Sequence, residues 1–447
     1  MTLTLLGLVF QTQAAMIQVR IDPRVELLTA IFRLQGADEF NMQSSANPYS
    51  HKLDAHLKPF KDHPAVKMVD RLREKVGIGF DSVPWLAVHI DGISNPRLLP
   101  GAHKEDHSKL WKKADLDVFL PLLGDFARDT QFEKFLESND GYLKSATKSL
   151  ESLLARKPVA QWLKDFYGHP PSEKSYAIVG LLCGGGNYGV SFRYQNEEIA
   201  AMPVLGAAEF DKDGVPVYGE GDLGLILHEF SHPYINHEVA KLPDIKKFGE
   251  PLFRLTKNSL AANAYGDAQS TMFETYTRAA ENIILQRNAP DLAAINMLEH
   301  RSKGFLWQSD VTDSLKEASK SQLPILERIK STIPTLESIS KKPKQLLARC
   351  PKVKSFDVKK SDVNGVSLIR IEFDQEMEKT SRGLSISPQD YEIVKRSSFD
   401  SSGKILELTV RFKKGVEYDL VVNAFGRGYY GLSGYPVQPL RKKTIVQ

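Results

Sequence analysis

The sequence predicts an α+β protein: a helix-rich part with a small mixed sheet, followed by an all-β sandwich. Three observations support this prediction. Helical apolar spacing dominates the chain before residue 170 and returns after residue 222. Short apolar or alternating runs, bounded by glycine and asparagine, lie between these helical regions. Beyond Cys350 the pattern changes to short alternating segments at the spacing of a sandwich.

Length and composition are those of an ordinary soluble globular protein. The 447 residues suffice for two or three domains, each with its own core. The formal net charge of +4 is small against 59 basic and 55 acidic side chains, and there is no arginine-rich stripe, so we expect no nucleic-acid partner. The sequence indicates no oligomeric state. We expect four segments, at residues 1–15, 16–312, 313–350 and 351–447.

The first segment, Met1 to Ala15, is an apolar run that ends in small residues and resembles the end of a secretory signal peptide. Thr12 and Ala14 have the spacing of a cleavage site. The run is shorter than the roughly 20 residues that cross a bilayer as a helix. It lacks a basic start, so a buried strand is the alternative. We expect a secreted protein, or one of the periplasm or cell envelope.

The second segment begins with a strand at residues 16–22, after which Pro23 opens a helix that runs to Leu34 and can end at Gly36. Further helices are predicted at residues 53–60, 65–76, 116–126, 132–155 and 159–167. A small meander is predicted from strands at residues 176–183, 190–194 and 199–206, with a turn at residues 184–187. No Gly-Lys-Ser/Thr follows the glycines of this turn, so a phosphate-binding loop is not expected.

The next helix, predicted to begin at Asp222, contains His228, Glu229 and His232 in the pattern His-Glu-x-x-His, which is typical of zinc peptidases. Residues four apart share one face of a helix, so both imidazoles can bind one metal ion. We expect Zn²⁺, which lowers the pKa of a bound water to about 7, with Glu229 as the general base. The alternative is a set of hydrogen bonds among buried side chains. Pro233 predicts that the helix kinks or ends after His232.

A catalytic zinc usually has a third protein ligand. In the extended pattern His-Glu-x-x-His-x-x-Gly-x-x-His, the glycine and the third ligand would fall at positions that hold Ile235 and Glu238, and His237 is one place out of register. Isoleucine suits a positive φ poorly, so we do not expect a third ligand so close in sequence. The two cysteines exclude a cysteine-ligated structural zinc site and a disulfide framework.

A later helix, predicted from Asp267 to Leu285, offers Glu274 and Glu281 on one face with Arg278 between them. The alternative for this face is a surface ladder of ion pairs. Aromatic and aliphatic neighbours of the three residues favour an inward-facing carboxylate instead.

These two helices together carry a resemblance. His228 to His232, combined with Glu274 to Ala279, resembles the gluzincin clan of metallopeptidases, in which a glutamate on a later helix is the third ligand. The stretch from Ile21 to about residue 300 is similar to an uncharacterised family of secreted bacterial proteins known as a domain of unknown function. The resemblance implies a zincin-like domain with His228, His232 and Glu274 as zinc ligands and Glu229 as the base, with Glu281 in reserve.

After this domain the sequence predicts a helical linker or bracing segment and then a sandwich. Residues 314–347 are helical but interrupted by Pro324 and Pro334. Strands are predicted at residues 353–358, 367–373, 391–394, 405–410 and 418–422. Residues 371–377 resemble the core of bacterial immunoglobulin-like domains, which implies a spacer or a contact with the cell envelope or another surface.

The first functional hypothesis is therefore a zinc metallopeptidase that hydrolyses a peptide or protein substrate, bound as an extended strand along a sheet edge. The second is a catalytically inactive zincin-like protein that binds or adheres at the cell envelope. A third keeps the hydrolase with a non-peptide amide or ester substrate. Tyr276, Arg278, His237 and Tyr188 are all candidates to stabilise the tetrahedral intermediate, and the sequence does not rank them.

Overall fold

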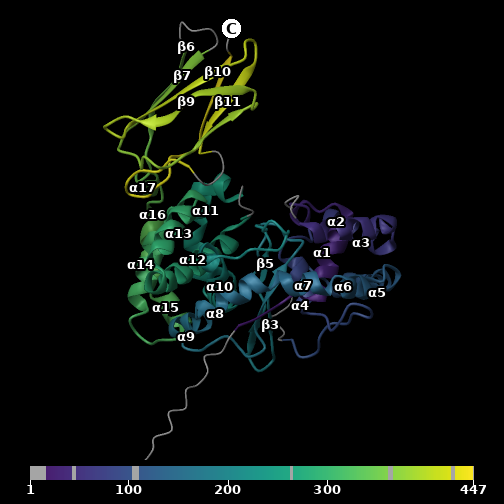
Figure 1. The fold of residues 1–447 in the computed structure, drawn as a ribbon. Helices are drawn as coiled ribbons and strands as arrows, with labels where there is room; N and C mark the ends of the chain where they lie inside the picture. Colours follow the sequence, from purple (N-terminus) through teal and green to yellow (C-terminus); the bar gives the residue numbers. More distant parts are fainter. Residues whose placement is uncertain are drawn as a thin grey trace, which may run out of the picture. The chain divides into compact units, whose positions relative to one another are not determined.

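The structure is a computed structural model of the chain and describes residues 17–42, 47–102, 110–261, 265–360, 366–423 and 428–445. These residues form helices and small sheets, which confirms the α+β class (Figure 1). The chain divides into two compact units, residues 1–234 and 235–447. The division falls within a single helix, and the domain boundaries expected at residues 312 and 350 stay predictions. The leader expected at residues 1–15 lies outside the described residues.

The first unit consists of helices and short strands. Its helices are α1 (Pro23–Gln35), α2 (Pro48–Leu57), α3 (Pro64–Val76), α4 (Ser82–Val88), α5 (Lys113–Asp129), α6 (Phe132–Ser138), α7 (Asp140–Ala146), α8 (Lys148–Arg156), α9 (Val159–Tyr167) and the first part of α10 (Leu223–Ala240). Its strands are β1 (Gln18–Arg20), β2 (Tyr176–Gly180), β3 (Ser191–Arg193), β4 (Ile199–Ala201) and β5 (Val204–Gly206). Short 3₁₀ turns lie at Asp38–Phe40, Lys58–Phe60 and Glu220–Asp222.

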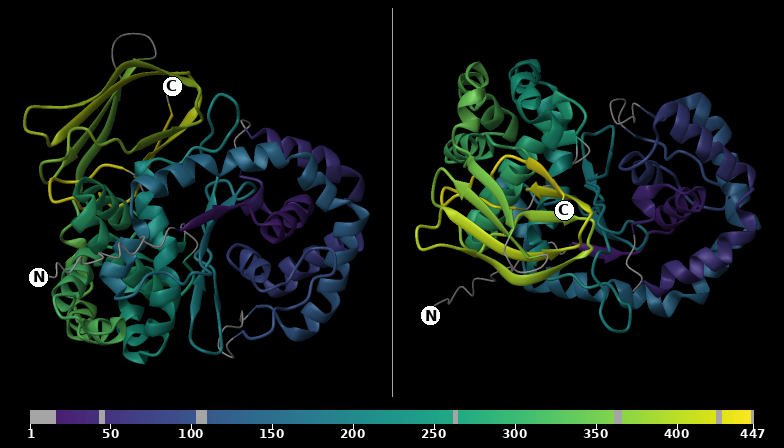
Figure 2. Two further views of the ribbon diagram at one scale, coloured as in Figure 1. Left: turned by 60° about the horizontal axis from the view of Figure 1, so that its bottom comes forward. Right: turned by 90° about the horizontal axis from the view of Figure 1, so that it is seen from above.

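Helix α1 is the centre of the helical part of this unit. Every residue from Val25 to Phe32 is buried, and Figure 2 shows this purple helix inside the curve formed by later helices of the unit. The Asp22 side chain caps its start by accepting the N–H of Arg24 at 3.0 Å, and Gly36 ends it with φ +108°. The predicted helix is thus confirmed, with Pro23 at its start and Gly36 at its end as expected.

The strands of the first unit form a parallel sheet and a separate hairpin, so the predicted meander is wrong. β1, β2 and β5 are parallel in the order β1-β2-β5, and β3 pairs with β4 in an antiparallel hairpin. The strand predicted at residues 199–206 is interrupted at Met202 and Pro203, because proline has no N–H for a ladder. The carbonyl of Pro203 instead accepts the N–H of Ile178, which directs β5 to the edge of β2.

Two helices also differ from prediction. The helix expected at residues 132–155 is three short helices, α6 to α8. The side chains of Asn139 and Thr147 bond to the carbonyls of Phe135 and Lys144, which is how such residues compete with a continuing helix. In contrast, α10 does not end at Pro233 but continues to Ala240. A single proline removes one N–H, and tertiary packing holds the rest of the helix in place.

The second unit begins with helices. They are α11 (Pro243–Ala261), α12 (Ala268–Asn288), α13 (Pro290–Ser302), α14 (Gln308–Ala318), α15 (Ile325–Lys330), α16 (Ile333–Lys341) and α17 (Lys344–Leu347). Asp267 caps α12 as expected by accepting the N–H of Ser270 at 2.9 Å. Helix α14 packs against α12, and α16 packs against α11, so the segment expected as a linker or brace packs on the preceding helices.

The strands of the second unit form two antiparallel sheets. They are β6 (Val353–Lys360), β7 (Val366–Phe373), β8 (Leu384–Ser387), β9 (Tyr391–Phe399), β10 (Ile405–Phe412), β11 (Glu417–Val422) and β12 (Leu440–Ile445), in the orders β6-β7-β10-β9 and β12-β11-β8. Residues from both sheets, including Phe373, Leu408 and Leu420, share one buried core. The five predicted strands are confirmed, whereas β8 and β12 were missed.

Side chains join the sheets to the helices of the same unit. Arg301 of α13 donates to the carbonyls of Ser433 and Gly434 at 3.1 and 3.2 Å, and its guanidinium lies over the ring of Tyr435. Arg349 binds both carboxylate oxygens of Asp310 and donates to the Tyr435 hydroxyl at 2.9 Å. The sheets are therefore fixed to these helices by a network of charged and aromatic contacts.

Two further findings concern the described residues only. None of their helices is long and apolar enough to cross a membrane. Cys183 and Cys350 are both buried and free, so they form no disulfide. Burial raises the pKa of both thiols.

Helix α1 contains a fully buried carboxyl group, Glu26, whose side chain faces the Tyr49 hydroxyl and the N–H of Leu181. Neither donor forms a hydrogen bond of normal geometry with the carboxyl group, and both carboxyl oxygens are buried without a bonded partner among the described residues. Burial therefore raises the pKa of Glu26 to about 8, although both donors act in the opposite direction.

We expect Glu26→Gln to weaken the pH dependence of stability. The folded carboxyl keeps its proton up to a pKa of about 8, whereas the unfolded one loses it near 4.5, so the free energy of unfolding falls as pH rises through this window. Urea unfolding at pH 5 and pH 8.5 should show a difference that is smaller in Glu26→Gln by on the order of a few kcal/mol. The exposed Glu151→Gln serves as control. An unchanged pH dependence in Glu26→Gln would contradict the assignment.

Candidate metal centre

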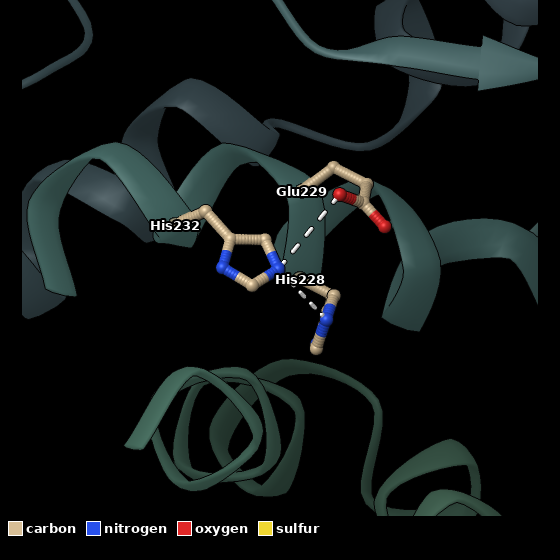
Figure 3. Close-up of side chains that lie close together, drawn as sticks. All are labelled: His228, Glu229 and His232. Carbon is tan, nitrogen blue, oxygen red and sulfur yellow. Dashed lines mark hydrogen bonds and ion pairs between the residues drawn. The ribbon is translucent and has the colours of Figure 1, made fainter. Parts of the chain in front are cut away.

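Helix α10 brings His228, Glu229 and His232 together. Each of the three offers one ligand atom, and these atoms lie within 4.8 Å of one another. Figure 3 shows the two rings and the carboxylate turned toward one another on the helix. His228, Glu229 and His232, three of the four predicted site residues, therefore lie together, because residues with this spacing share one face of a helix.

The distances between these side chains fit one metal ion. The Nε2 atoms of His228 and His232 are 3.1 Å apart, and the ring planes are nearly perpendicular, at 89°. This separation suits a hydrogen bond between the rings, and it is also close to the value of about 3.3 Å for two nitrogens that bind Zn²⁺ tetrahedrally. Glu229 Oε2 lies 3.9 Å from His232 Nε2, beyond hydrogen-bonding distance. The histidines fit the ligand positions, and Glu229 fits the position of a base beside them.

The rest of α10 explains why these polar groups are held in place. Ile226, Leu227 and Phe230 on the same helix are fully buried, and the Ser231 hydroxyl donates to the Leu227 carbonyl at 2.7 Å. His228 and Glu229 are buried as well. A polar pair in such surroundings needs hydrogen bonds or a metal ion to balance the loss of water. A hydrogen bond between the rings or a cation shared by the two imidazoles would supply this balance.

The main chain of Gly189 lies directly against the metal-binding face. A methyl group added at Gly189 would lie 2.7 Å from the Cβ and Cδ2 atoms of His232 and 2.8 Å from the carbonyl oxygen of Glu229. Residue 233 is proline, so it cannot donate the usual helical hydrogen bond to this carbonyl. Gly189 could not be selected from the sequence, since a lone glycine after a glycine-rich turn is interpreted as loop.

The segment that carries Gly189 is fixed by pairing on one side. Tyr188 and Val204 exchange both main-chain hydrogen bonds at 2.9 Å, and Val190 accepts the N–H of Met202. The N–H of Val190 also donates to the carbonyl of Tyr188 at 3.0 Å, so the chain makes a tight turn at Gly189. No main-chain hydrogen bond involves the N–H or C=O of Gly189 among the described residues. The turn at Gly189 thus lies beside His232.

The predicted third ligand, Glu274, lies on α12 in the second unit. Its Oε2 accepts from Arg278 at 2.9 Å and from the Tyr265 hydroxyl at 3.2 Å. Arg278 is buried and packs against the rings of Tyr265 and Phe305. A surface ladder of ion pairs is therefore the wrong reading of this face. The assignment of Glu274 as a metal ligand stays a prediction.

The other two carboxylates considered for this role have different surroundings. Glu281 is buried, lies 3.5 Å from His300 Nε2 and accepts a short hydrogen bond from Asn296. Glu238 binds the exposed Lys241 at 3.0 Å. Glu274, by contrast, is held by an arginine and a tyrosine, which is the kind of support that orients a ligating carboxylate.

The structure separates the four candidates for stabilising a tetrahedral intermediate. The Tyr276 hydroxyl is fully buried and bonds to Thr332 at 2.6 Å. Arg278 binds Glu274, and the Tyr188 hydroxyl bends back along its own turn toward Gly186. These three are held by structural contacts. His237 lies half-buried on the last turns of α10.

Comparisons with known proteins give a family and no activity. A family model described as Domain of unknown function (DUF4932) matches residues 17–331. This confirms the resemblance to a family of unknown function over most of the chain. No curated protein matches the chain.

Two solved structures of S-layer proteins also match. One is the S-layer protein rSbsC, with 14% identity, a TM-score of 0.18 and coverage of 50% of this chain and 32% of that one. The other is domains 1–6 of the surface layer protein SbsC, with 12% identity, a TM-score of 0.16 and coverage of 49% and 33%. The chain spans about a third of the length of these structures. The similarity is too low to carry an argument.

We expect the purified protein to bind one Zn²⁺ per chain, and His228→Ala to abolish this binding. If Glu274 is the third ligand, Glu274→Gln should weaken Zn²⁺ affinity at least tenfold. Glu238→Gln is the control, because Glu238 pairs with a surface lysine. Competition with a fluorescent chelator measures all of these affinities. Equal affinities for the two glutamine variants would exclude Glu274.

A second prediction concerns Gly189. Gly189→Ala should reduce Zn²⁺ affinity, because the new methyl group would displace the ring of His232 or the helix carbonyl behind it. Gly185→Ala is the control in the same turn, since open space surrounds Gly185. Thermal unfolding of both variants without metal separates a local effect from loss of the fold. Unchanged affinity in Gly189→Ala would show that the contact with His232 is not tight.

Proposed function

The chain belongs to the family described as Domain of unknown function (DUF4932), and we propose that this member is a zinc-dependent hydrolase that cleaves peptide bonds. The observation that carries the proposal is the pair of imidazole nitrogens 3.1 Å apart beside a buried carboxylate. In this proposal the site is of the gluzincin type. His228 and His232 hold the metal from α10, and Glu274 completes the set from α12.

Each residue of the site has one chemical task. When bound, Zn²⁺ supplies Lewis acidity, which polarises a carbonyl group and lowers the pKa of a water molecule to about 7. Glu229 accepts a proton from the attacking water and returns it to the leaving amine, as a general base and then a general acid. Its burial beside the histidines keeps the carboxylate at one position and limits competing water. Arg278 and Tyr265 orient Glu274.

The main-chain groups of Gly189 support a peptide as the substrate. A peptide can form main-chain hydrogen bonds with such groups, and these bonds do not depend on its side chains. The N–H and C=O of Gly189 form no main-chain hydrogen bond among the described residues, so they offer one donor and one acceptor next to His232. A peptide bond bound at Gly189 would lie beside His232. A non-peptide amide or ester has fewer main-chain groups for this contact.

The proposal extends to location and to the C-terminal sheets. The apolar leader of the sequence supports export, so we place the enzyme outside the cell or in the cell envelope. Two antiparallel sheets with a common core support an immunoglobulin-like module. Its role is to contact an envelope component or another surface. The network around Arg301, Arg349 and Tyr435 fixes this module to α13 and α14.

The decisive experiment is hydrolysis by wild type and Glu229→Gln. With Zn²⁺ bound, wild type should cleave a mixture of quenched peptides, and Glu229→Gln should lose at least a hundredfold in kcat while it keeps its metal. Metal content is measured on the same samples. Full activity in Glu229→Gln would refute the assigned base.

A matched control uses another buried glutamate of the same unit. Glu39→Gln alters a carboxylate that binds Arg73 at 2.5 Å and leaves the histidines untouched. It should therefore keep kcat within a few-fold of wild type. If wild type binds Zn²⁺ but cleaves none of the peptides, esters or amides supplied, the hydrolase proposal fails and an inactive binding protein remains.

A further inference from the structure

Strand β9 is the edge strand of the four-stranded sheet in the C-terminal module, residues 351–447 (Figure 1). The strands β7 and β10 of this sheet bury alternate side chains between the two sheets. β9 does not, because every residue from Glu392 to Arg396 is exposed. The exposed set includes two large aliphatic side chains, Ile393 at 53% and Val394 at 46%. The middle of β9 therefore contributes little to the core.

The facing sheet leaves Ile393 uncovered. Ile393 pairs with Val410 of β10, whose side chain is fully buried, so both side chains belong to the core-facing side of the sheet. In the facing sheet, β12 packs on the side of β6, where Lys442 lies over the ring of Phe356. Its other edge, on the side of β9, is β8, which has only 4 residues against 9 in β9. The short β8 explains why an aliphatic residue on the core-facing side remains in water.

The backbone of β9 is poorly suited to pairing with another strand. Its register with β10 shifts twice, between Glu407 and Thr409 and between Thr409 and Val410. Such irregularities interrupt the row of N–H and C=O groups that an added strand needs, and they are a common protection against edge-to-edge association. A second copy of the chain or an extended peptide is thus disfavoured as a partner of this edge. The side chains of β9 are what a partner can bind.

Two cationic side chains follow the exposed aliphatic pair. Lys395 and Arg396 form no ion pair within the described part of the chain, whereas Glu392 binds Arg411. The module has the same sign of charge: residues 351–447 contain 17 basic and 12 acidic side chains, against 42 and 43 in residues 1–350. Basic residues also protect edge strands from aggregation, but that role does not require exposed isoleucine and valine. β9 therefore combines uncompensated positive charge with exposed apolar surface.

We propose that Ile393, Val394, Lys395 and Arg396 bind the interfacial layer of an anionic membrane leaflet. Lys395 pairs with Thr409, next to the Val410 partner of Ile393, so Lys395 and Ile393 point to opposite faces of the sheet. A fluid headgroup layer can surround the edge and contact both faces, whereas a folded protein surface covers one. Aliphatic side chains enter the boundary between headgroups and acyl chains, and basic side chains are attracted to anionic headgroups.

This inference rests on the envelope contact proposed for the module and names its partner, and it does not depend on the zinc chemistry. Cleavage of short peptides in solution should therefore be equal in wild type and in variants of β9. The hydrolase proposal and the membrane inference then stand or fail separately.

The test is flotation of the full chain with vesicles of equal parts phosphatidylglycerol and phosphatidylcholine, or of phosphatidylcholine alone. Wild type should bind the anionic vesicles at least tenfold more tightly, and added salt should weaken this binding. Lys395→Gln combined with Arg396→Gln should reduce the affinity tenfold or more, since each basic residue near the surface contributes about fivefold. Ile393→Ser combined with Val394→Ser should reduce it severalfold and keep the salt dependence. Absence of binding to the anionic vesicles overturns the inference.

A matched control removes the same charge from the opposite edge of the same sheet. Lys354 and Lys359 are exposed on β6, and the double variant Lys354→Gln with Lys359→Gln should keep most of the affinity. Equal losses in the two charge variants would show general attraction by the module and overturn the assignment to β9. Binding to an anionic polysaccharide without binding to vesicles, or a dimer that the β9 variants disrupt, would also overturn it.

A fluorescent label provides a readout that keeps the charges of β9. Cys183 and Cys350 are buried, so an environment-sensitive dye attaches to the introduced thiol of Val394→Cys. Its emission should shift to shorter wavelength on anionic vesicles, because residue 394 enters the interfacial layer. The same dye at Lys354→Cys is the control and should not shift. A shift at both positions, or at neither, contradicts binding through β9.

Discussion

The candidate site depends on one physical constraint: two imidazoles on adjacent turns of a largely buried helix lie close enough to share a single partner. The separation of 3.1 Å between their Nε2 atoms suits either a hydrogen bond between the rings or one metal ion bound by both. Helix geometry sets this distance, and the buried aliphatic and aromatic residues of α10 prevent the helix from rotating to expose the rings. The geometry of the candidate site is therefore a consequence of how α10 is buried.

The same burial explains the close contact with Gly189. Pro233 cannot donate a helical hydrogen bond to the carbonyl of Glu229, and only a residue without a side chain can approach this carbonyl so closely. Pairing of Tyr188 with Val204 on β5 holds the segment that carries Gly189 in place. This pairing and the glycine in the turn thus act together to place the main chain of Gly189 beside His232.

The sequence predicted the parts of this arrangement that are local. The histidine spacing, the helix start at Pro23, the Asp267 cap and the alternating strands after Cys350 follow from near neighbours in the chain, and the structure has them. It could not predict the parallel pairing of β2 with β5 or the contact of Gly189 with His232, because both join segments far apart in sequence. The sequence predicted a kink or an end of α10 at Pro233, and the end is wrong for the same reason, since long-range packing outweighs one lost hydrogen bond.

Three costly features lie around the turn at residues 181–189, and they come from different parts of the chain. Glu26 is buried without complete hydrogen bonds near Leu181, and Phe80 is strained and exposed. Gly184, Gly186 and Gly189 of the turn pack at distances that leave no space for a methyl group. A fold selected for stability alone would lose each of these features by a single substitution. Their concentration beside α10 indicates selection for another property. The residues with these unfavourable features therefore lie in the same region as the residues proposed to bind a metal. No residue belongs to both groups.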